Sequence, residues 1–562
     1  MKKLPDISVF VFFLCIYMIF SNQRITTSMD VDVIRYASDW LESGYYGSEL
    51  KLSAGVSYSP RTGLFYPQEG IGIVAPLAGL IYLSGIISPD SQFMIFTFNQ
   101  IFSALSMFLV FLILSMLMTK KKAFIYSVLF GIATPVFVHS KYLMPEPITM
   151  LSITASLYFL ARFSKTGKPV FIFLSGLSAG YSLLARPDSP IFAAIFSAYA
   201  LYTAYRSGKT SLIKNAALYV TGALVFTSVF FVSNYRRYGS FLETGYTLNI
   251  IEVRTALEKG VAETYEKALK AYEKDQTSRE TALLVTQFQH RQRFLEDIDK
   301  LIETHGEKST AFYTNGFANF LHGIYLILFS PNRSIIFLSP FLIILLASAV
   351  TGLKKYRTKV LFASATFFSY MILYALRAPL SFAGSAAWGI RYMLPVYPLL
   401  FLSAILYENS AVSKKKAVKR IFYGLCFLSV AIQLVGSAVN YQSVQMPVEY
   451  RAKLDYGEEG NEWITRSRLR MMTGFSSSLP VNNARIIAGS LTPEQKAYGV
   501  ETGPNDWFFY QVLKGEGMLL RGKEHMNGGF KAMLFMLILS LGSSSYFIYK
   551  NIMVPENAGE EK

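Results

Sequence analysis

Apolar residues along this chain are gathered into runs of roughly 16–25 residues separated by short polar stretches. That length matches the ~30 Å hydrocarbon core of a bilayer crossed by an α-helix. The pattern predicts an all-α, polytopic membrane protein with about twelve spans and both ends on the cytoplasmic side. The expected spans are approximately 5–21, 93–118, 123–138, 147–162, 170–185, 190–205, 212–233, 334–352, 360–377, 391–407, 420–439 and 530–549.

The side of the membrane on which each loop lies depends on one apolar run, 71–88, which contains Pro76. If this run crossed the bilayer, the basic clusters of the later loops would fall outside. If it lies in the outer interface or re-enters, those clusters become cytoplasmic, as basic loops usually are. We therefore expect an interfacial or re-entrant segment at 71–88 and another at 317–329. The clusters that this arrangement places inside are 120–122, 162–168, 206–214, 354–359, 414–420 and Lys550.

Composition supports a membrane protein and argues against nucleic-acid binding. The chain has 562 residues, of which 52% are hydrophobic and 16% charged, with a net charge of +17. Its mean hydropathy is +0.33. Lysines and arginines sit in short clusters between apolar runs, where they act as topology signals. Cys15 and Cys426 both lie inside apolar runs, which favours packed thiols over a disulfide framework.

Polar stretches divide the chain into five parts. The first, 1–235, is a transmembrane half whose first outer loop covers 22–92. An extracytoplasmic helical insertion and a re-entrant segment follow at 236–333, and residues 252–308 are rich in Ala, Glu and Lys at helical spacing. The remaining parts are transmembrane helices at 334–440, an extracytoplasmic cap at 441–529, and a last helix with a cytoplasmic tail at 530–562.

Charged residues from distant segments map to the outer side of this topology. Asp30 and Asp32 follow the first span, where ordinary solvation of a loop is the alternative explanation. Glu146 begins the fourth span, and a capping role at the helix N-terminus would also explain it. Three cations lie at the same level, where snorkelling to the headgroups is the alternative: Arg391, Arg186 and Lys141. Their convergence on one side predicts a polar cleft.

Several classes of function are disfavoured by what the sequence lacks. It has no P-loop, no GxGxxG fingerprint after a strand, and no paired-cysteine site. The five histidines have no spacing typical of metal ligands, so no metal site is expected. The expected span centres also lack the ionisable residues of a proton-coupled carrier.

A series of short motifs follows these charged positions in order. They are Asp30 to Gly44, Arg61-Thr62-Gly63-Leu64-Phe65-Tyr66-Pro67, Met144-Pro145-Glu146-Pro147, Leu184-Ala185-Arg186-Pro187, Asn234 to Ser240 with Glu243 to Tyr246, Phe329-Ser330-Pro331, and Trp388 to Pro395. In this order the chain resembles polytopic lipid-dependent glycosyltransferases of the GT-C fold. It is most similar to the bacterial and archaeal branch of protein O-mannosyltransferases and lipid A aminoarabinose transferases.

The resemblance implies a GT-C-like helical bundle that transfers a sugar from a polyprenyl-phosphate carrier to an acceptor hydroxyl with inversion. The acceptor would be a protein, a glycolipid or a cell-wall polymer at the outer face of the cell membrane. A first-loop acid would act as general base, with Asp30 preferred and Asp32 its rival, and Glu146 would orient acceptor or sugar. Arg391 would be the first candidate to bind the phosphate, and Arg186 and Lys141 the next. The remaining substrate-binding residues would be Arg61, Tyr66 and Tyr392.

The chain departs from the family pattern at two places. The usual Asp-Glu pair is replaced by Asp30-Val31-Asp32, which leaves the base unassigned between the two acids, and the 252–308 insertion is not part of the family core. Some members of the family use a divalent cation, and three carboxylates could hold one. Two other functions stay open: a transporter or flippase of lipid-linked saccharides, and a non-catalytic assembly protein of the same fold.

Overall fold

A computed structural model describes most of the chain. The described residues are 4–21, 28–44, 47–49, 56–68, 70–87, 93–206, 209–245, 247–248, 250–275, 278–305, 316–376, 388–389, 391–440, 443, 447, 479–497, 500, 502–504, 506–514, 516–519, 522–525 and 528–554. Much of the expected 441–529 cap and the end of the tail therefore lie outside the described residues.

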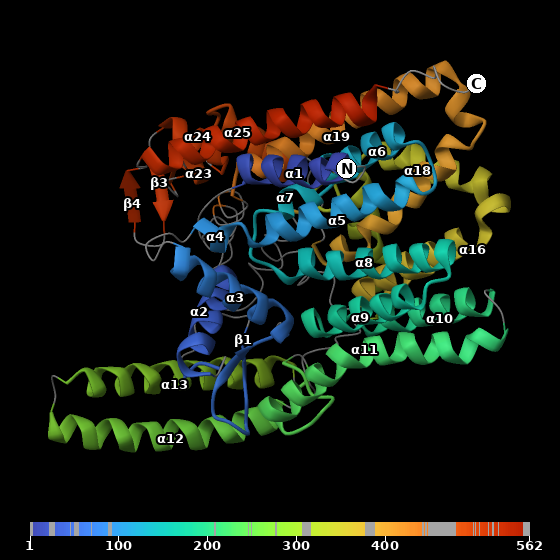
Figure 1. Cartoon of the computed structure of the whole chain (residues 1–562). Coiled ribbons are helices and arrows are strands. Elements are labelled where there is room, and N and C mark those ends of the chain that lie inside the picture. Colours follow the sequence, from blue (N-terminus) through green and yellow to red (C-terminus); the bar gives the residue numbers. More distant parts are fainter. Residues whose placement is uncertain are drawn as a thin grey trace.

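Helices dominate the described part of the chain (Figure 1). Up to the long insertion they are α1 (Leu4–Ile19), α2 (Ser28–Ser43), α3 (Ile71–Ile87), α4 (Phe93–Phe96), α5 (Phe98–Ser115), α6 (Lys120–Ile132), α7 (Val136–His139), α8 (Pro145–Thr166), α9 (Pro169–Ala185), α10 (Pro190–Arg206) and α11 (Lys209–Tyr238). A short antiparallel hairpin in the first loop pairs β1 (Val56–Tyr58) with β2 (Phe65–Pro67).

The second half continues in the same manner. Its helices are α12 (Ile250–Lys274), α13 (Arg279–His305), α14 (Gly316–Leu328), α15 (Ile335–Leu338), α16 (Phe341–Leu376), the 3-10 helix η1 (Arg391–Leu400), α18 (Phe401–Glu408), the 3-10 turn η2 (Val412–Lys414), α19 (Lys416–Ala438), α22 (Leu479–Ile487), α23 (Pro493–Ala497), α24 (Phe508–Lys514), α25 (Gly528–Ile548) and the π-helix η3 (Tyr549–Met553). A second antiparallel hairpin pairs β3 (Glu516–Leu519) with β4 (Gly522–His525).

Four of the described helices are both long enough and apolar enough to cross a membrane. They are Phe98–Ser115, Leu212–Tyr238, Lys416–Ala438 and Lys531–Met553, and shorter apolar helices accompany them. The all-α, polytopic fold expected from the sequence is thus confirmed, and the chain is a multi-pass membrane protein. The count of about twelve spans stays a prediction.

One helix replaces two of the expected spans. The pattern predicts spans at 334–352 and 360–377 joined by a basic loop, whereas α16 is a single helix of 36 residues through both. Its sequence contains no proline, and lysine and arginine are good helix formers. The basic residues at 354–359 therefore continue the helix where the hydropathy pattern alone predicts a break.

Prolines interrupt two other expected spans. The 391–407 stretch begins as the 3-10 helix η1, which contains Pro395 and Pro398, and becomes α-helical only in α18. Proline cannot donate a backbone hydrogen bond and clashes with the preceding turn, so a regular α-helix is disfavoured there. The expected span at 123–138 likewise divides into α6 and α7 at Pro135.

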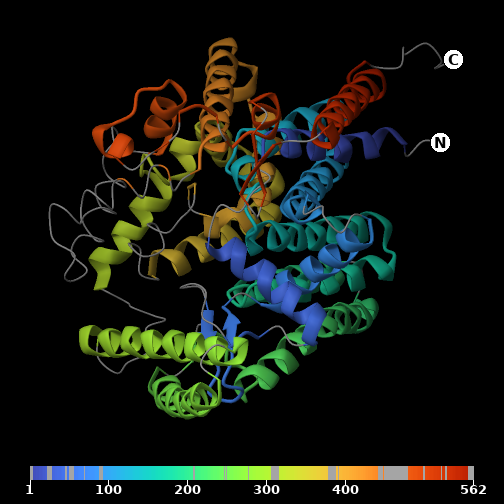
Figure 2. The same cartoon turned by 90° about the vertical axis from the view of Figure 1, so that its left-hand side faces the viewer.

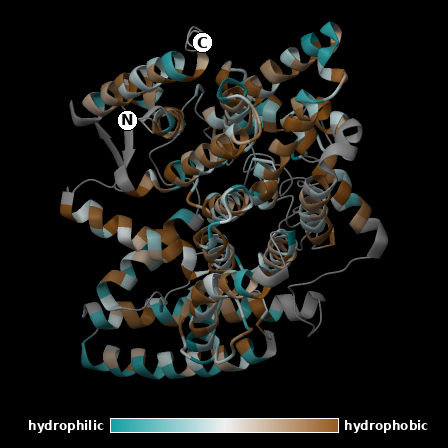
Figure 3. Ribbon diagram, turned by 45° about the vertical axis from the view of Figure 1, so that its right-hand side comes forward, coloured by the Kyte–Doolittle hydropathy of each residue, from teal (hydrophilic) through white to brown (hydrophobic). Residues whose placement is uncertain are grey.

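The insertion folds as two antiparallel helices that lie side by side in Figures 1 and 2. Arg254 of α12 and Asp299 of α13 join them through an ion pair of 2.6 Å. Helix α13 also contacts the β1–β2 hairpin. Arg291 Nη2 donates to the Gly63 carbonyl at 3.1 Å, and Phe294 packs edge-on against Phe65. Figure 3 shows more hydrophilic colour on this hairpin than on the bundle helices.

Glycines allow α9 and α11 to approach each other closely. Gly176 and Gly180 of α9 form a GxxxG pattern, and a Cβ on either would collide with the backbone of α11 at Tyr219 or Ala223. Gly222 of α11 meets the Phe173 carbonyl in the same way. Small residues drive helix association in membranes by letting backbones touch. This contact fixes the C-terminal end of α9, which leads into Arg186.

We expect Gly180→Val to lower the unfolding temperature of the detergent-solubilised protein. The new side chain must displace the Ala223 backbone, and overpacking of this kind costs about 1–3 kcal/mol or more. Gly424→Ala in α19 is the matched control, since a Cβ there meets nothing within 4 Å. Equal unfolding temperatures for Gly180→Val and the native protein would contradict the close α9–α11 contact.

Candidate functional site

Asp30 and Asp32 both lie on α2 and both are buried, at 2% and 3% exposure. Residues two positions apart on a helix point to different sides. Asp30 Oδ1 accepts a hydrogen bond of 3.2 Å from the backbone N–H of Leu143. Asp32 lies instead near Tyr36, one turn further along, and burial together with the Asp32 charge raises the pKa of Tyr36. The two acids therefore belong to different surroundings.

The segment from Lys141 to Glu146 links Asp30 to a second charged group. It runs from the end of α7 to the first turn of α8, where Pro145 begins the helix. The Asn99 side chain of α5 donates to the Met144 carbonyl at 3.0 Å and also to the Tyr142 carbonyl. These bonds hold the segment open at the point where Leu143 reaches Asp30. The space beside Asp30 is too narrow for a water molecule in this conformation.

Glu146, three residues beyond Leu143, is a buried carboxylate held by two arginines. Arg186 Nη1 donates to Glu146 Oε1 at 2.5 Å, and Arg391 Nε lies 3.6 Å from the same oxygen. Burial by itself would raise the pKa of Glu146, but the charges of Arg186 and Arg391 outweigh it and lower that pKa. The carboxylate therefore stays ionised. Its other oxygen, Oε2, is buried with no hydrogen-bond partner among the described residues.

Arg186 also donates hydrogen bonds to Asp188 and Tyr374. Its Nε and Nη2 donate to the two carboxylate oxygens of Asp188 at 3.0 and 2.6 Å, a bidentate arrangement. Nη2 also donates to the Tyr374 hydroxyl at 3.1 Å, and that hydroxyl donates to Asp188. The tight turn over 186–189 is placed by the start of α3, since Gly70 and Gly72 pack directly on the backbone of Leu184 and Ala185.

Arg391 donates to neutral acceptors, a thioether and a hydroxyl. Its Nη1 donates to the Met144 thioether at 3.5 Å and its Nη2 to the Tyr392 hydroxyl at 2.8 Å. A thioether is a weak acceptor, whereas the carboxylates that Arg186 meets are strong ones. The Tyr392 ring lies against both guanidinium groups, at 4.9 Å from Arg186 Cζ and 4.7 Å from Arg391 Cζ, and stacks on Tyr374.

Two further groups surround this cluster that the motifs did not single out. His139 Nε2 lies 2.7 Å from the Trp388 carbonyl and must donate to it, and burial lowers the pKa of His139 to about 4. Arg333 is 3% exposed and donates to the Gly389 carbonyl at 3.1 Å. Arg333 could have been found in the sequence as a cation beside the Ser330-Pro331 break. Asp188, which the motifs also missed, could have been found by its place two residues after Arg186.

Lys141 pairs with Asp506 and lines the same narrow space as Asp30. Its ammonium is buried and donates to Asp506 Oδ2 at 2.7 Å, to the Ser437 carbonyl at 2.9 Å and to the Val439 carbonyl at 3.3 Å. An ammonium has three donors, and these acceptors use all of them. These contacts tie the α7–α8 segment to the end of α19, and the phosphate-binding role expected of Lys141 stays a prediction.

Arg61 and Tyr66 contact the end of α11. Arg61, on the β1–β2 turn, is exposed, and its Nη1 donates to the Tyr235 carbonyl at 2.6 Å. Tyr66 is buried on β2 and packs edge-on against Tyr238 at 6.1 Å. Both residues fix the first loop to the end of α11. Their expected role in substrate binding stays a prediction.

No group of three or more histidine, cysteine, aspartate or glutamate side chains gathers in metal-binding geometry within the part of the chain that the structure describes. Asp30 and Glu146 bond to separate donors, the Leu143 N–H and Arg186.

Comparison with protein families adds an independent observation. Residues 75–234 match the family model described as dolichyl-phosphate-mannose-protein mannosyltransferase. The matched stretch runs from α3 to α11 and includes Glu146 and Arg186, whereas Asp30, Asp32 and Arg391 lie outside it. The match confirms the resemblance that the sequence motifs indicate. A comparison with curated proteins finds no match.

Solved structures with similarity to the chain include two membrane enzymes. The oligosaccharyltransferase of Archaeoglobus fulgidus, crystallised with Zn and sulfate, is 14% identical with a TM-score of 0.42. The alignment covers 81% of this chain and 57% of the archaeal one, so the chain spans little more than half of that enzyme's length. ArnT from Cupriavidus metallidurans bound to undecaprenyl phosphate is 10% identical with a TM-score of 0.38, covering 88% of this chain and 81% of ArnT.

We expect Asp506→Ala to destabilise the protein by about 3–5 kcal/mol, because it leaves the Lys141 ammonium buried without its carboxylate. The double variant Lys141→Met/Asp506→Leu, which removes both charges, should recover most of that loss. Unfolding midpoints in detergent measure both effects. Asp6→Ala breaks the exposed Lys120–Asp6 pair and should change stability by about 0–1 kcal/mol. A mild effect of Asp506→Ala alone would contradict a structural ion pair.

Proposed function

We propose that this chain is an integral membrane glycosyltransferase that moves a sugar from a polyprenyl-phosphate donor to an acceptor hydroxyl with inversion. The observation that carries the proposal is the short Leu143–Glu146 segment. One end of it bonds the buried carboxylate of Asp30, and the other presents Glu146 between Arg186 and Arg391. Residues three positions apart in this segment thus contact the proposed carboxylate base and the proposed cationic phosphate site. The family match to residues 75–234 supports the same class of reaction.

Asp30 is the better candidate for the general base. It faces the segment that carries Glu146, whereas Asp32 lies near Tyr36 on another side of α2. In the transfer the acceptor oxygen attacks the anomeric carbon, and Asp30 takes the hydroxyl proton. The bond from the anomeric carbon to the phosphate oxygen breaks at the same time. A single displacement of this kind inverts the configuration of the anomeric carbon.

Arg391 is the preferred ligand of the donor phosphate. Its ion pair with Glu146 is long, at 3.6 Å, and its other contacts include a thioether, so a phosphate oxygen offers a stronger partner. Arg186 is already bidentate to Asp188 and acts as a positioning residue. Cations that meet the phosphate stabilise the negative charge that develops on the leaving group. A phosphate leaves readily, so the reaction requires no strong general acid.

Glu146 positions the cluster and offers one contact to substrate. Its Oε1 orients both arginines, and its buried Oε2, which lacks a partner among the described residues, can accept a hydrogen bond from a sugar or acceptor hydroxyl. The lipid chain of the donor would lie in the bilayer, and the acceptor would come from the extracytoplasmic side that the basic loops assign to this end of the bundle. The acceptor is a protein, a glycolipid or a cell-wall polymer.

Asp30→Asn is expected to lower kcat for sugar transfer by about 10²–10⁴-fold, the usual contribution of a general base. The amide can still bond the Leu143 N–H, so the local fold is kept. Asp32→Asn is the matched control and should retain most of the activity. Transfer from a radiolabelled polyprenyl-phosphate sugar in proteoliposomes measures both. Normal transfer by both variants would remove the catalytic interpretation, and loss only in Asp32→Asn would reverse the assignment.

Arg391→Gln should weaken donor binding, seen as a higher KM for the lipid-linked sugar, and lower kcat because the departing phosphate loses a charge partner. Arg391→Lys should restore only part of the activity, since an ammonium cannot replace a planar guanidinium. Arg236→Gln, at an exposed position of α11, serves as the control. An unchanged donor KM in a folded Arg391→Gln protein would exclude the phosphate role.

A further inference from the structure

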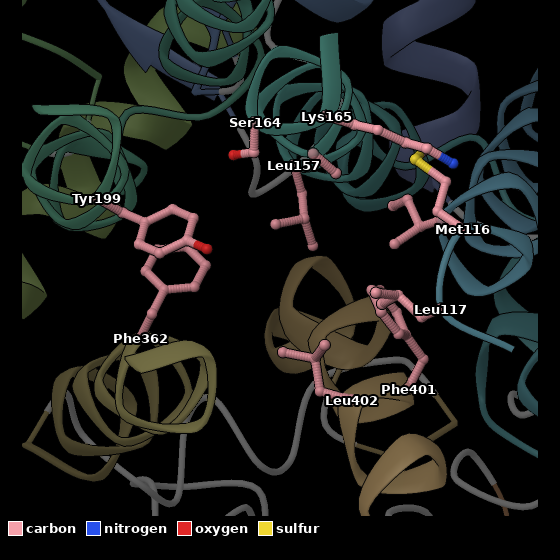
Figure 4. Close-up of a pocket in the computed structure, with 11 residues that line it drawn as sticks. Met116, Leu117, Leu157, Ser164, Lys165, Tyr199, Phe362, Phe401 and Leu402 are labelled. Carbon is pink, nitrogen blue, oxygen red and sulfur yellow. The ribbon is translucent and has the colours of Figure 1, made fainter. Parts of the chain in front are cut away.

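An apolar cavity of about 370 Å³ lies among five helices, well away from the charged cluster. Its walls come from the end of α5, from α8, α10, α16 and α18 (Figure 4). Leu157, Phe401 and Leu402 supply aliphatic and aromatic surface, and Tyr199 stacks on Phe362 with ring centroids 4.3 Å apart. A cavity of this size is in the range of small-molecule pockets, and its lining is suited to a hydrocarbon.

The cavity occupies the opposite end of the helices that build the charged cluster. Helix α8 begins with Glu146 and contributes Leu157 and Lys165 to the cavity, roughly 16 and 28 Å further along at 1.5 Å per residue. Helix α16 brings Tyr374 to the cluster and Phe362, about 18 Å away, to the cavity. The two sites are therefore separated by roughly half of the ~30 Å thickness of a bilayer core or more.

The mouth of the cavity carries one lysine that is not paired in the described structure. Lys165 is exposed, and it has no hydrogen bond or ion pair among the described residues. Two other lysines at this end, Lys120 and Lys122, are paired with Asp6 at 2.7 Å and with Glu408 at 2.6 Å. Ser164 lines the same rim and offers a hydroxyl.

We propose that this cavity binds one acyl chain of an anionic phospholipid whose phosphate pairs with Lys165. An apolar chamber between membrane helices is open to the most abundant hydrocarbon around it, the lipid chains. A basic residue at its rim selects a negatively charged headgroup, as basic pockets between transmembrane helices do. The cavity between α5, α8, α10, α16 and α18 exists only in the folded bundle. A lipid that binds there therefore stabilises the folded state by mass action.

The site is tested on the full-length protein in detergent micelles, with dioleoylphosphatidylglycerol and dioleoylphosphatidylcholine as probes. We expect the anionic lipid to raise the unfolding temperature more than the zwitterionic one and to be retained by the purified protein in native mass spectrometry. Lys165→Gln should lower retention of the anionic lipid about fivefold, the change expected from the loss of one lysine–phosphate attraction. Lys168→Gln, in the following loop and outside the cavity lining, should leave it unchanged.

Ala161→Phe fills the cavity from α8 and should abolish retention of both lipids. If that variant fails to fold, a phosphatidylglycerol with a photoreactive acyl chain replaces it, and its adducts should map to peptides containing Leu157, Tyr199 or Phe362. Three results would overturn the proposal: equal retention in Lys165→Gln and native protein, adducts confined to other helices, or displacement of the lipid only by polyprenyl phosphate. The last would assign the cavity to the donor chain.

Discussion

The buried carboxylate of Glu146 is the constraint on which the charged end of the bundle depends. An ionised carboxylate away from water is stable only with charge partners, and here two arginines from distant segments supply them. Arg186 comes from the turn after α9 and Arg391 from the start of η1. The ion pairs of Glu146 therefore join α8 to the end of α9 and to η1. The hydrogen bonds of Arg186 with Asp188 and Tyr374 extend this network to α16.

The first loop is anchored to the rest of the protein at two places. Asp30 anchors α2 to the Leu143 backbone, while the β1–β2 turn is fastened to α11 through Arg61 and to the α12–α13 hairpin through Arg291. The inserted hairpin thus braces the loop that carries both acidic candidates.

The bundle has two chemically different ends. Charged and aromatic groups surround Glu146 at one end, and the cavity at the other is lined by apolar side chains with Lys165 at its rim. Helices α8 and α16 contribute to both ends, so occupancy of the cavity by lipid would act on packing that also fixes the charged end. Glycine contacts between α9 and α11 hold the helices in register between the two ends.

Hydrophobic run length by itself determined that the chain is a helical membrane protein, because spanning a bilayer requires a fixed number of apolar residues. The motifs likewise marked Asp30, Glu146, Arg186 and Arg391, since charges beside apolar runs are costly unless they have a function. Only the tertiary structure separated Arg186 from Lys141, because the two cations look alike in sequence and differ in which acid lies opposite, Glu146 or Asp506. It also showed that Asp30 and Asp32 have different surroundings, since the neighbours of each helix face, such as Leu143 beside Asp30, come from distant segments. The cavity lined by α5, α8, α10, α16 and α18 likewise depends on contacts between segments distant in the sequence, which no local pattern records.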